Sequence, residues 1–283
     1  PPQWYVDMYD PGYEGDEVNY PVYGFADYLS KRELQHMRAM YAAEATLVDR
    51  WIGKLLQKIE DMGLFKNTVI FLTTDHGFLH GEHNITGKSI ITEKGHCRVP
   101  LYEEIAHVPL IVKFPGVEHS RSDAFVQPPD IVPTILDLFG IKIPEFVHGK
   151  SYADILKGKK KSHRDFSITS PAIDQNPVVS LVKTTISTKD WSLLLSAKRG
   201  ISGKITTSEV DGILRRNGLE KSVREKIAKF IPYVNELYNL KEDPHQKNNI
   251  YESNRSIADD MERAYIEFLK EIKTPEKFLK NWI

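Results

Sequence analysis

The apolar residues of the first third of the chain follow a helical period and then a pattern typical of a buried strand. Between Val48 and Ile59 they recur at i, i+4, i+7, i+8 and i+11, which predicts one apolar stripe on a long helix that begins near Lys31. Residues 68–74 are short, β-branched and almost continuously apolar, as in a strand that is buried on both faces. Residues 108–113 predict a second strand of the same kind.

The next pattern is again helical, over residues 131–139, and it stops at Gly140. Helix, buried strand, loop, strand and helix in this order predict an α/β fold with a mostly parallel sheet that is flanked by helices. Residues 1–30 are rich in Pro, Gly, Tyr and Asp and show no period, so they predict a surface loop.

The second half of the chain has a different pattern, which predicts a smaller α+β subdomain. The segments that indicate it are strands at 178–188, 191–196 and 236–240 and a final helix over 254–272. A basic segment at residues 157–164 marks the boundary, so we expect domains at 1–160 and 161–283. Residues 208–230 predict an inserted helical pair with no assigned role.

Composition and charge exclude several classes of protein. The 283 residues include 38 Lys+Arg and 39 Asp+Glu, and this balance argues against nucleic acid as a partner. No apolar run approaches the roughly 18 residues of a membrane span. The single cysteine, Cys97, excludes an internal disulfide. We expect a soluble protein; no signal peptide opens the sequence, which leaves the compartment unknown.

The chemistry concentrates in the polar stretch that follows the first buried strand. Asp75 and His76 stand where that strand ends, which is where open α/β sheets bind ligands. A carboxylate and an imidazole on a sharp turn at Gly77 can both face one divalent metal. Lys88 can supply a positive charge to a tetrahedral oxyanion, and metal plus lysine suits a sulfate or phosphate ester.

Taken singly, these residues have simpler interpretations. An Asp-His pair after a strand is more often a turn residue and a packed ring than a metal site. Lys88 alone would more often be a solvated lysine, and a loop rich in Gly and His, such as the one that contains His83, can be an ordinary surface loop. Only their combination at the end of a strand favours a site.

Several short motifs, in order along nearly the whole chain, resemble the second half of a sulfatase of the alkaline phosphatase superfamily. They are TDHG at 74–77, GEH at 81–83, GK at 87–88, PLYEE at 100–104, VPLIV at 108–112, PDIVPTILD at 129–137, HGKS at 148–151 and ELYNL at 236–240. In the resemblance, residues 41–64 match the helix that precedes the metal-binding strand, and Tyr102 with its two following glutamates is mainly structural.

The resemblance also implies roles for individual residues. Asp75 and His76 match the late metal ligands of the family, Lys88 matches the lysine that holds the ester, and His83 matches a catalytic position near the site. Calcium is the usual metal, but many members have Asn where His76 stands. An imidazole ligand suits manganese or zinc better than calcium, and magnesium stays open as well.

The family nucleophile is absent from this sequence. It lies in a Cys-x-Pro-x-Arg or Ser-x-Pro-x-Arg motif, in which the first residue becomes formylglycine, and the early metal ligands are two aspartates upstream of it. Cys97 precedes Arg98 and Pro100 in the wrong order and spacing, and we interpret it as a partly buried small residue. The resemblance therefore implies a C-terminal part, with formylglycine in the absent N-terminal part.

The sequence thus predicts the late metal ligands and ester-binding lysine of a divalent-metal-dependent sulfatase. A phosphomonoesterase, a phosphodiesterase or a phosphonate monoester hydrolase of the same superfamily is the alternative, because nothing in this half selects sulfur over phosphorus. A catalytically silent fragment or interaction module is the alternative from another class. Because the absent half would cover central strands and helices, we expect exposed apolar faces, and either that half or self-association as the partner.

Overall fold

The computed structural model describes residues 1–93, 95–170, 183–196, 215, 220–230, 235–280 and 282–283. Two compact units make up the chain. The first comprises residues 1–74, 78–91 and 109–116, and the second comprises 75–77, 92–108 and 117–283. The boundary expected at residue 160 stays a prediction. No helix within the described ranges is long and apolar enough to cross a membrane.

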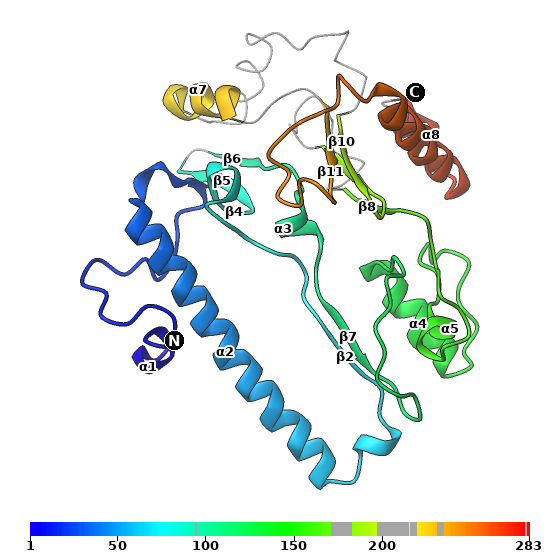
Figure 1. Cartoon of the computed structure of the whole chain (residues 1–283). Helices are drawn as coiled ribbons and strands as arrows, with labels where there is room; N and C mark the ends of the chain where they lie inside the picture. The colour runs from blue at the N-terminus through cyan, green and yellow to red at the C-terminus, as the bar shows by residue number, and fades with distance from the viewer. Residues whose placement is uncertain (94, 171–182, 197–214, 216–219, 231–234, 281) are drawn as a thin grey trace. The chain divides into compact units, whose positions relative to one another are not determined.

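The first unit is built on one long helix, α2 (Lys31–Asp61), which Figure 1 shows in blue. Ser30 begins it with a capping box: its hydroxyl accepts from the Glu33 N–H, and the Glu33 carboxylate accepts from the Ser30 N–H. The short helix α1 (Gln3–Val6) packs on α2 through Tyr5 and Val6. Residues 1–30, expected to be a loop, therefore contribute to the core of this unit.

Burial along α2 is confined to its first half. Met37, Met40 and Ala43 are buried there. Farther along, Val48 is 54% exposed and Leu55 is 60% exposed, so the predicted stripe exists but is only partly covered. Periodicity indicates which side of a helix can be buried, and it does not indicate whether another element covers that side.

The strands of the first unit pair antiparallel. β1 (Gly24–Phe25) and β3 (Leu79–His80) flank β4 (Ile85–Gly87). The two apolar runs become β2 (Ile70–Thr73) and β7 (Leu110–Lys113). β2 pairs with β7, and their facing residues Leu72 and Ile111 are both exposed. The remaining elements are η1 (Ala26–Tyr28), η2 (Phe65–Asn67), η3 (Glu82–Asn84) and most of β5 (Ser89–Thr92).

Two expectations about these strands are corrected. The strands are partly exposed, because an apolar run is buried only where layers cover both faces of the sheet. Every strand pair whose register the structure gives is antiparallel, so the expected parallel pairing is not found among the described residues. The physical reason at β2 and β7 is that a parallel neighbour needs a crossover connection, usually a helix across the sheet. The helices that the structure describes between these strands, η3 and α3 (Glu103–Ala106), have only three and four residues.

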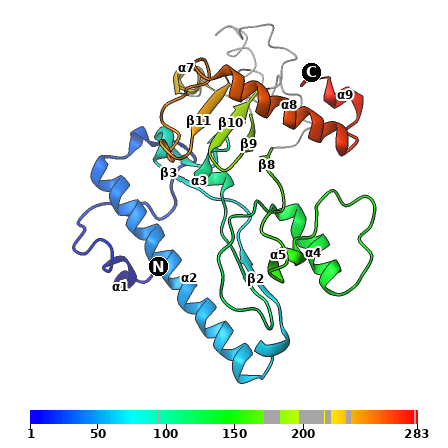
Figure 2. The same ribbon diagram turned by 45° about the vertical axis from the view of Figure 1, so that its right-hand side comes forward.

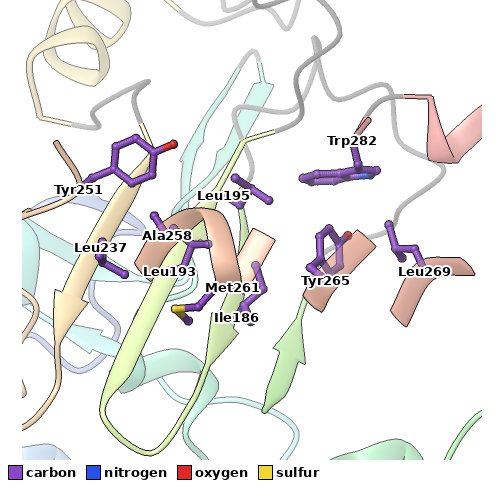
Figure 3. Close-up of a cluster of buried hydrophobic side chains, with 10 residues drawn as sticks. All are labelled: Ile186, Leu193, Leu195, Leu237, Tyr251, Ala258, Met261, Tyr265, Leu269 and Trp282. Carbon is purple, nitrogen blue, oxygen red and sulfur yellow. The ribbon is translucent and has the colours of Figure 1, made fainter. Parts of the chain in front are cut away.

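The second unit contains a four-stranded antiparallel sheet in the order β11-β10-β9-β8. Its strands are β8 (Ser167–Thr169), β9 (Thr184–Ser187), β10 (Trp191–Leu195) and β11 (Glu236–Asn239). The helix α8 (Arg255–Glu271) lies against one face of this sheet (Figure 2). Strand and helix side chains meet there in one core, with Leu193, Leu237 and Tyr265 at most 1% exposed (Figure 3). The α+β pattern predicted for this half is confirmed.

Shorter elements complete the second unit. They are β6 (Gly95–Arg98), α3 (Glu103–Ala106), η4 (Pro128–Asp130), α4 (Ile131–Leu138), α5 (Ala153–Leu156), α7 (Lys221–Phe230) and α9 (Glu276–Leu279). The helix α7 lies where the second helix of the predicted insertion is expected, and the insertion itself stays a prediction. The first helix, near 208–216, lies almost entirely outside the described residues, as do residues 178–182 of the strand predicted before β9.

Candidate functional site

Asp75 and His76 form a tight turn two residues beyond β2, within the second unit. One oxygen of Asp75, Oδ1, accepts the backbone N–H of His76 at 3.0 Å, and the other, Oδ2, lies 3.1 Å from His76 Nε2. The Asp75 side chain is 80% exposed, whereas that of His76 is 32% exposed. The carboxylate and the imidazole are therefore brought together on an accessible turn, as the sequence predicts.

The hydrogen bond at the other ring nitrogen defines the chemistry of this pair. His76 Nδ1 lies 2.8 Å from the carbonyl oxygen of Gly77, which can only accept, so Nδ1 carries a proton and donates it. In the neutral ring, Nε2 then presents a lone pair toward the Asp75 carboxylate. The lone pairs of Asp75 Oδ2 and His76 Nε2 repel each other at this separation unless both atoms bind one cation, which can be a proton or a metal ion. A histidine whose Nδ1–H bonds a backbone carbonyl is a common form of metal ligand.

Further metal ligands would have to come from elsewhere. Within the described part of the chain, no group of three His, Cys, Asp or Glu side chains is close enough to hold a metal ion. Asp75 and His76 fit two positions of a coordination shell, because oxygen and imidazole nitrogen donors suit manganese or zinc. The donor pair is thus compatible with a divalent metal but does not complete its site.

Gly77 is held against the short helix α3. Its N–H donates to the carbonyl oxygen of Ile105 at 2.9 Å. A Cβ atom at this position would lie 1.8 Å from the carbonyl oxygen of Glu104, so only glycine fits. The sequence indicates a glycine turn here but not its contact with α3, because the partner lies almost thirty residues away along the chain.

Lys88 occupies the single exposed position between β4 and β5, within the first unit. Gly87 before it has φ +99°, and a Cβ there would lie 2.8 Å from the ring of Tyr23. The N–H of Ile91 also donates to the Tyr23 carbonyl at 2.8 Å. Tyr23 therefore packs beside the segment that carries Lys88.

His83 lies in η3 of the same unit and has φ 53°, in the left-handed region that residues other than glycine rarely adopt. Asn84 follows with φ 59°, and its side chain donates to Asp27 at 2.9 Å. The preceding Glu82 accepts from Arg38 at 3.1 Å. Asn and His adopt this region more readily than most residues other than glycine, so the conformation by itself assigns no role to His83.

The four predicted site residues thus fall in two pairs, and each pair is described within its own unit. Asp75 and His76 are in contact, whereas His83 and Lys88 flank β4. The roles of all four stay predictions. The side chain of Cys97 lies outside the described residues, as does its predicted partial burial. The predicted structural role of Tyr102 agrees with its place before α3, which has Glu103 and Glu104 in its first turn.

Comparison with known families identifies the chain. Residues 2–141 match the family model described as Sulfatase. Residues 96–194 match a second model, described as N-sulphoglucosamine sulphohydrolase, C-terminal. The first match contains Asp75, His76, His83 and Lys88, and the second ends within β10. The chain belongs to the sulfatase family.

Individual relatives agree with this family. An ulvan-active sulfatase of Formosa agariphila is 31% identical over 159 residues, which are 55% of this chain and 28% of that protein. An endo-4-O-sulfatase of Bacteroides thetaiotaomicron is 28% identical over 262 residues, which are 90% of this chain and 46% of that protein. The chain thus spans less than half the length of both relatives.

Solved structures share the fold. A protein in complex with its substrate D-glucosamine-2-N,6-O-disulfate superposes with a TM-score of 0.64 at 23% identity, over 89% of this chain and 45% of that one. A phosphonate monoester hydrolase of Agrobacterium radiobacter superposes with a TM-score of 0.57 at 18% identity, over 86% of this chain and 43% of that one. The alkaline-phosphatase-like α/β class is therefore confirmed. Membership of the family also implies a divalent metal ion.

Proposed function

We propose that this chain supplies part of the active site of a sulfatase that hydrolyses sulfate monoesters. The observation that carries the proposal is the Asp75–His76 pair, whose Oδ2 and Nε2 lie 3.1 Å apart on an exposed turn inside the sulfatase match. The family's Cys- or Ser-x-Pro-x-Arg motif is not found in these 283 residues. The nucleophile, as formylglycine, then comes from polypeptide outside this sequence.

In this proposal each residue has a defined task. Asp75 and His76 hold the divalent metal, which when bound polarises the ester oxygens. Manganese and zinc match the His76 nitrogen better than calcium does, although calcium is usual in the family. The ammonium group of Lys88 binds the ester oxyanion, and His83 assists near the leaving group. Gly77 holds the turn in place through Ile105.

Sulfated carbohydrates are the substrate class that the relatives support. One is named as active on ulvan, another as an endo-4-O-sulfatase, and a structural neighbour binds a glucosamine disulfate. The phosphoryl and phosphonate alternatives have weaker support, because the phosphonate monoester hydrolase shares only the fold at 18% identity. The nucleophile-bearing half of the enzyme is the partner that we propose for this chain.

Metal binding by the purified chain tests the assignment of the pair. Titrated Mn²⁺ should bind weakly, because only two ligands are provided, and Asp75→Asn should remove the binding while the circular dichroism spectrum stays unchanged. Asp123→Asn is the matched control, since Asp123 is an exposed aspartate of the same unit. Tight binding by this chain alone, or unchanged binding by Asp75→Asn, would contradict the proposed division of ligands.

Turnover tests the activity itself. In a protein that joins this chain to a nucleophile-bearing segment, Asp75→Asn should lower the kcat for an aryl sulfate by roughly a hundredfold or more, because a metal ligand is lost. Aryl phosphate and phosphonate esters measured side by side distinguish the alternatives. Faster turnover of either one than of the sulfate would replace the sulfatase proposal with a phosphoryl or phosphonate hydrolase.

A further inference from the structure

A buried polar cluster lies between the C-terminal sheet and α3, entirely within the second unit. At its centre is Glu236 on β11, which is fully buried. The Tyr102 hydroxyl donates to Glu236 Oε2 at 3.1 Å, the Tyr238 hydroxyl donates to the same oxygen, and the Lys183 ammonium group donates to Oε1. A buried ion pair is costly unless its remaining lone pairs are satisfied, and the two phenols supply those hydrogen bonds.

The protonation states of the two phenols agree with these donor roles. Burial raises the pKa of both the Tyr102 and the Tyr238 hydroxyls, and the Glu236 charge raises them further. Both phenols therefore keep their protons at neutral pH and donate to the carboxylate. Tyr102 immediately precedes α3, whereas Tyr238 belongs to β11, so of the two phenols Tyr102 lies on the segment that leads into α3. The two rings also meet in a T-shaped contact, with centroids 6.4 Å apart.

A second group of contacts ties the same short helix to the sheet. The backbone N–H of Glu103 donates to Gln246 Oε1 at 2.7 Å, and Gln246 Nε2 donates to the Ser192 hydroxyl on β10 at 3.0 Å. The Thr185 hydroxyl on β9 donates to the Leu101 carbonyl at 2.7 Å. Gln246 is 1% exposed, and its backbone has φ 50°, in the left-handed region, so a buried side chain on a strained backbone caps the start of α3.

The helix in turn holds the turn of the candidate site. The Gly77 N–H donates to the carbonyl of Ile105 in α3, and the Gly77 Cα lies against the carbonyl of Glu104. Gly77 follows His76 directly and accepts the hydrogen bond from His76 Nδ1. A continuous path of hydrogen bonds and backbone connections therefore runs from Glu236 through Tyr102 and α3 to the imidazole.

We propose that Tyr102 is a positioning residue for the metal-binding pair: its hydrogen bond to Glu236 fixes α3 and thereby the turn that carries Asp75 and His76. The metal-binding part of this inference rests on the proposed function, whereas the effect on the turn does not. A motif that is predicted from the sequence to be mainly structural thus connects the C-terminal sheet to the site.

Two matched substitutions in the full chain test this role. Tyr102→Phe and Tyr238→Phe each remove one hydroxyl from the same Glu236 oxygen and leave the rings in place. Tyr102→Phe should speed hydrogen exchange of the Gly77 amide by roughly fivefold, which is the factor expected when the net contribution of one hydrogen bond is lost. Tyr238→Phe should leave that amide unchanged. Equal acceleration by both, or by neither, would overturn the proposal.

Mn²⁺ titrated alone provides the second measurement, read from broadening of the His76 ring signals. Tyr102→Phe should weaken the apparent affinity by roughly tenfold, as for an outer-shell partner, and Tyr238→Phe should not. If Asp75→Asn fails to change Mn²⁺ binding, the proposed function fails, but the Gly77 exchange still decides the positioning role.

A third variant covers the case in which Tyr102→Phe does not fold. Gln246→Asn keeps an amide that tolerates the left-handed backbone but is one methylene shorter, so it loses the Glu103 N–H. It should also speed Gly77 exchange. An unchanged Gly77 amide in a folded Gln246→Asn chain would contradict the coupling of α3 to the turn.

Discussion

Gly77 shows how one residue without a side chain determines the geometry of its neighbours. The carbonyl of Glu104 occupies the place of a Cβ atom, and the N–H is bonded to Ile105. Any larger residue has to push the turn away from α3, and His76 moves with it because its Nδ1 bonds the Gly77 carbonyl. The relative position of the Asp75 and His76 side chains therefore depends on the absence of a side chain at Gly77.

Gly77→Ala should accordingly lower the free energy of unfolding by about 1–3 kcal/mol, the usual cost of inserting atoms into a packed position. Urea denaturation measures it. Gly53→Ala is the matched control, because Gly53 lies within α2 with no atom near its Cβ position. That substitution should raise stability by up to about 1 kcal/mol through helix propensity. Equal, small effects at both glycines would show that the turn has room to relax.

At the scale of elements, α2 illustrates a helix whose beginning is encoded locally. The capping box at Ser30 and Glu33 satisfies two backbone N–H groups at once. Much of the helix surface is exposed, so the cap and intrinsic propensity carry more of its stability than they would in a buried helix. Ser30→Ala should lower the free energy of unfolding by about 1 kcal/mol, measured by chemical denaturation.

The matched control for this cap is Ser89→Ala in β5, a serine that begins no helix. Ser30→Thr should retain most of the stability, since threonine also caps. If the Ser30→Ala chain were as stable as the parent, the backbone N–H groups in the first turn of α2 would have to find other hydrogen-bond acceptors.

The elements that sequence patterns predicted well are those whose signals are local. The start of α2, the strands β10 and β11 and the helix α8 agree with their predicted positions within one or two residues. Caps, alternation and helical periods need only neighbouring residues. The direction of β2 against β7 and the burial of their faces depend on partners far away in the sequence, and no local pattern reports them.

The candidate site divides in the same way. Asp75 and His76 stand out because a carboxylate and an imidazole at a strand end are a local signal, and Lys88 stands out as a lysine in the polar stretch that follows. The support that Glu236 gives to this site cannot be recognised from a local pattern, because Tyr102 and Glu236 are separated by 134 positions. Tyr102 was predicted to be structural, and its chemical connection to the turn becomes visible only through the tertiary contacts of α3.

At the scale of the whole molecule, the first unit exposes an unusual amount of apolar surface. Val48, Trp51 and Leu55 follow one another along α2 at helical spacing and are all more than half exposed. On the strands of the same unit, the facing residues Leu72 and Ile111 are also exposed. Monomeric proteins rarely leave such faces open to water, so this surface favours a covering partner.

The proposed partner, a nucleophile-bearing half, predicts how the chain behaves without it. Burying the exposed side chains between two copies removes apolar area from water, at about 25 cal/mol per Å². We therefore expect the purified chain to self-associate, with an average mass in sedimentation equilibrium that rises with concentration. The double substitution Trp51→Lys and Leu55→Lys should shift the molecule toward the monomer, because two charges would lie in the contact.

The double substitution Met8→Lys and Val22→Lys is the appropriate control for that experiment, since both are exposed apolar residues of the same unit that lie outside the α2 face. It adds the same charge and should leave the association unchanged, so a general effect of net charge can be separated from loss of the apolar contact. A parent chain that stays monomeric at every concentration would contradict the expected association. Equal dissociation by both variants would assign it to charge rather than to the exposed face of α2.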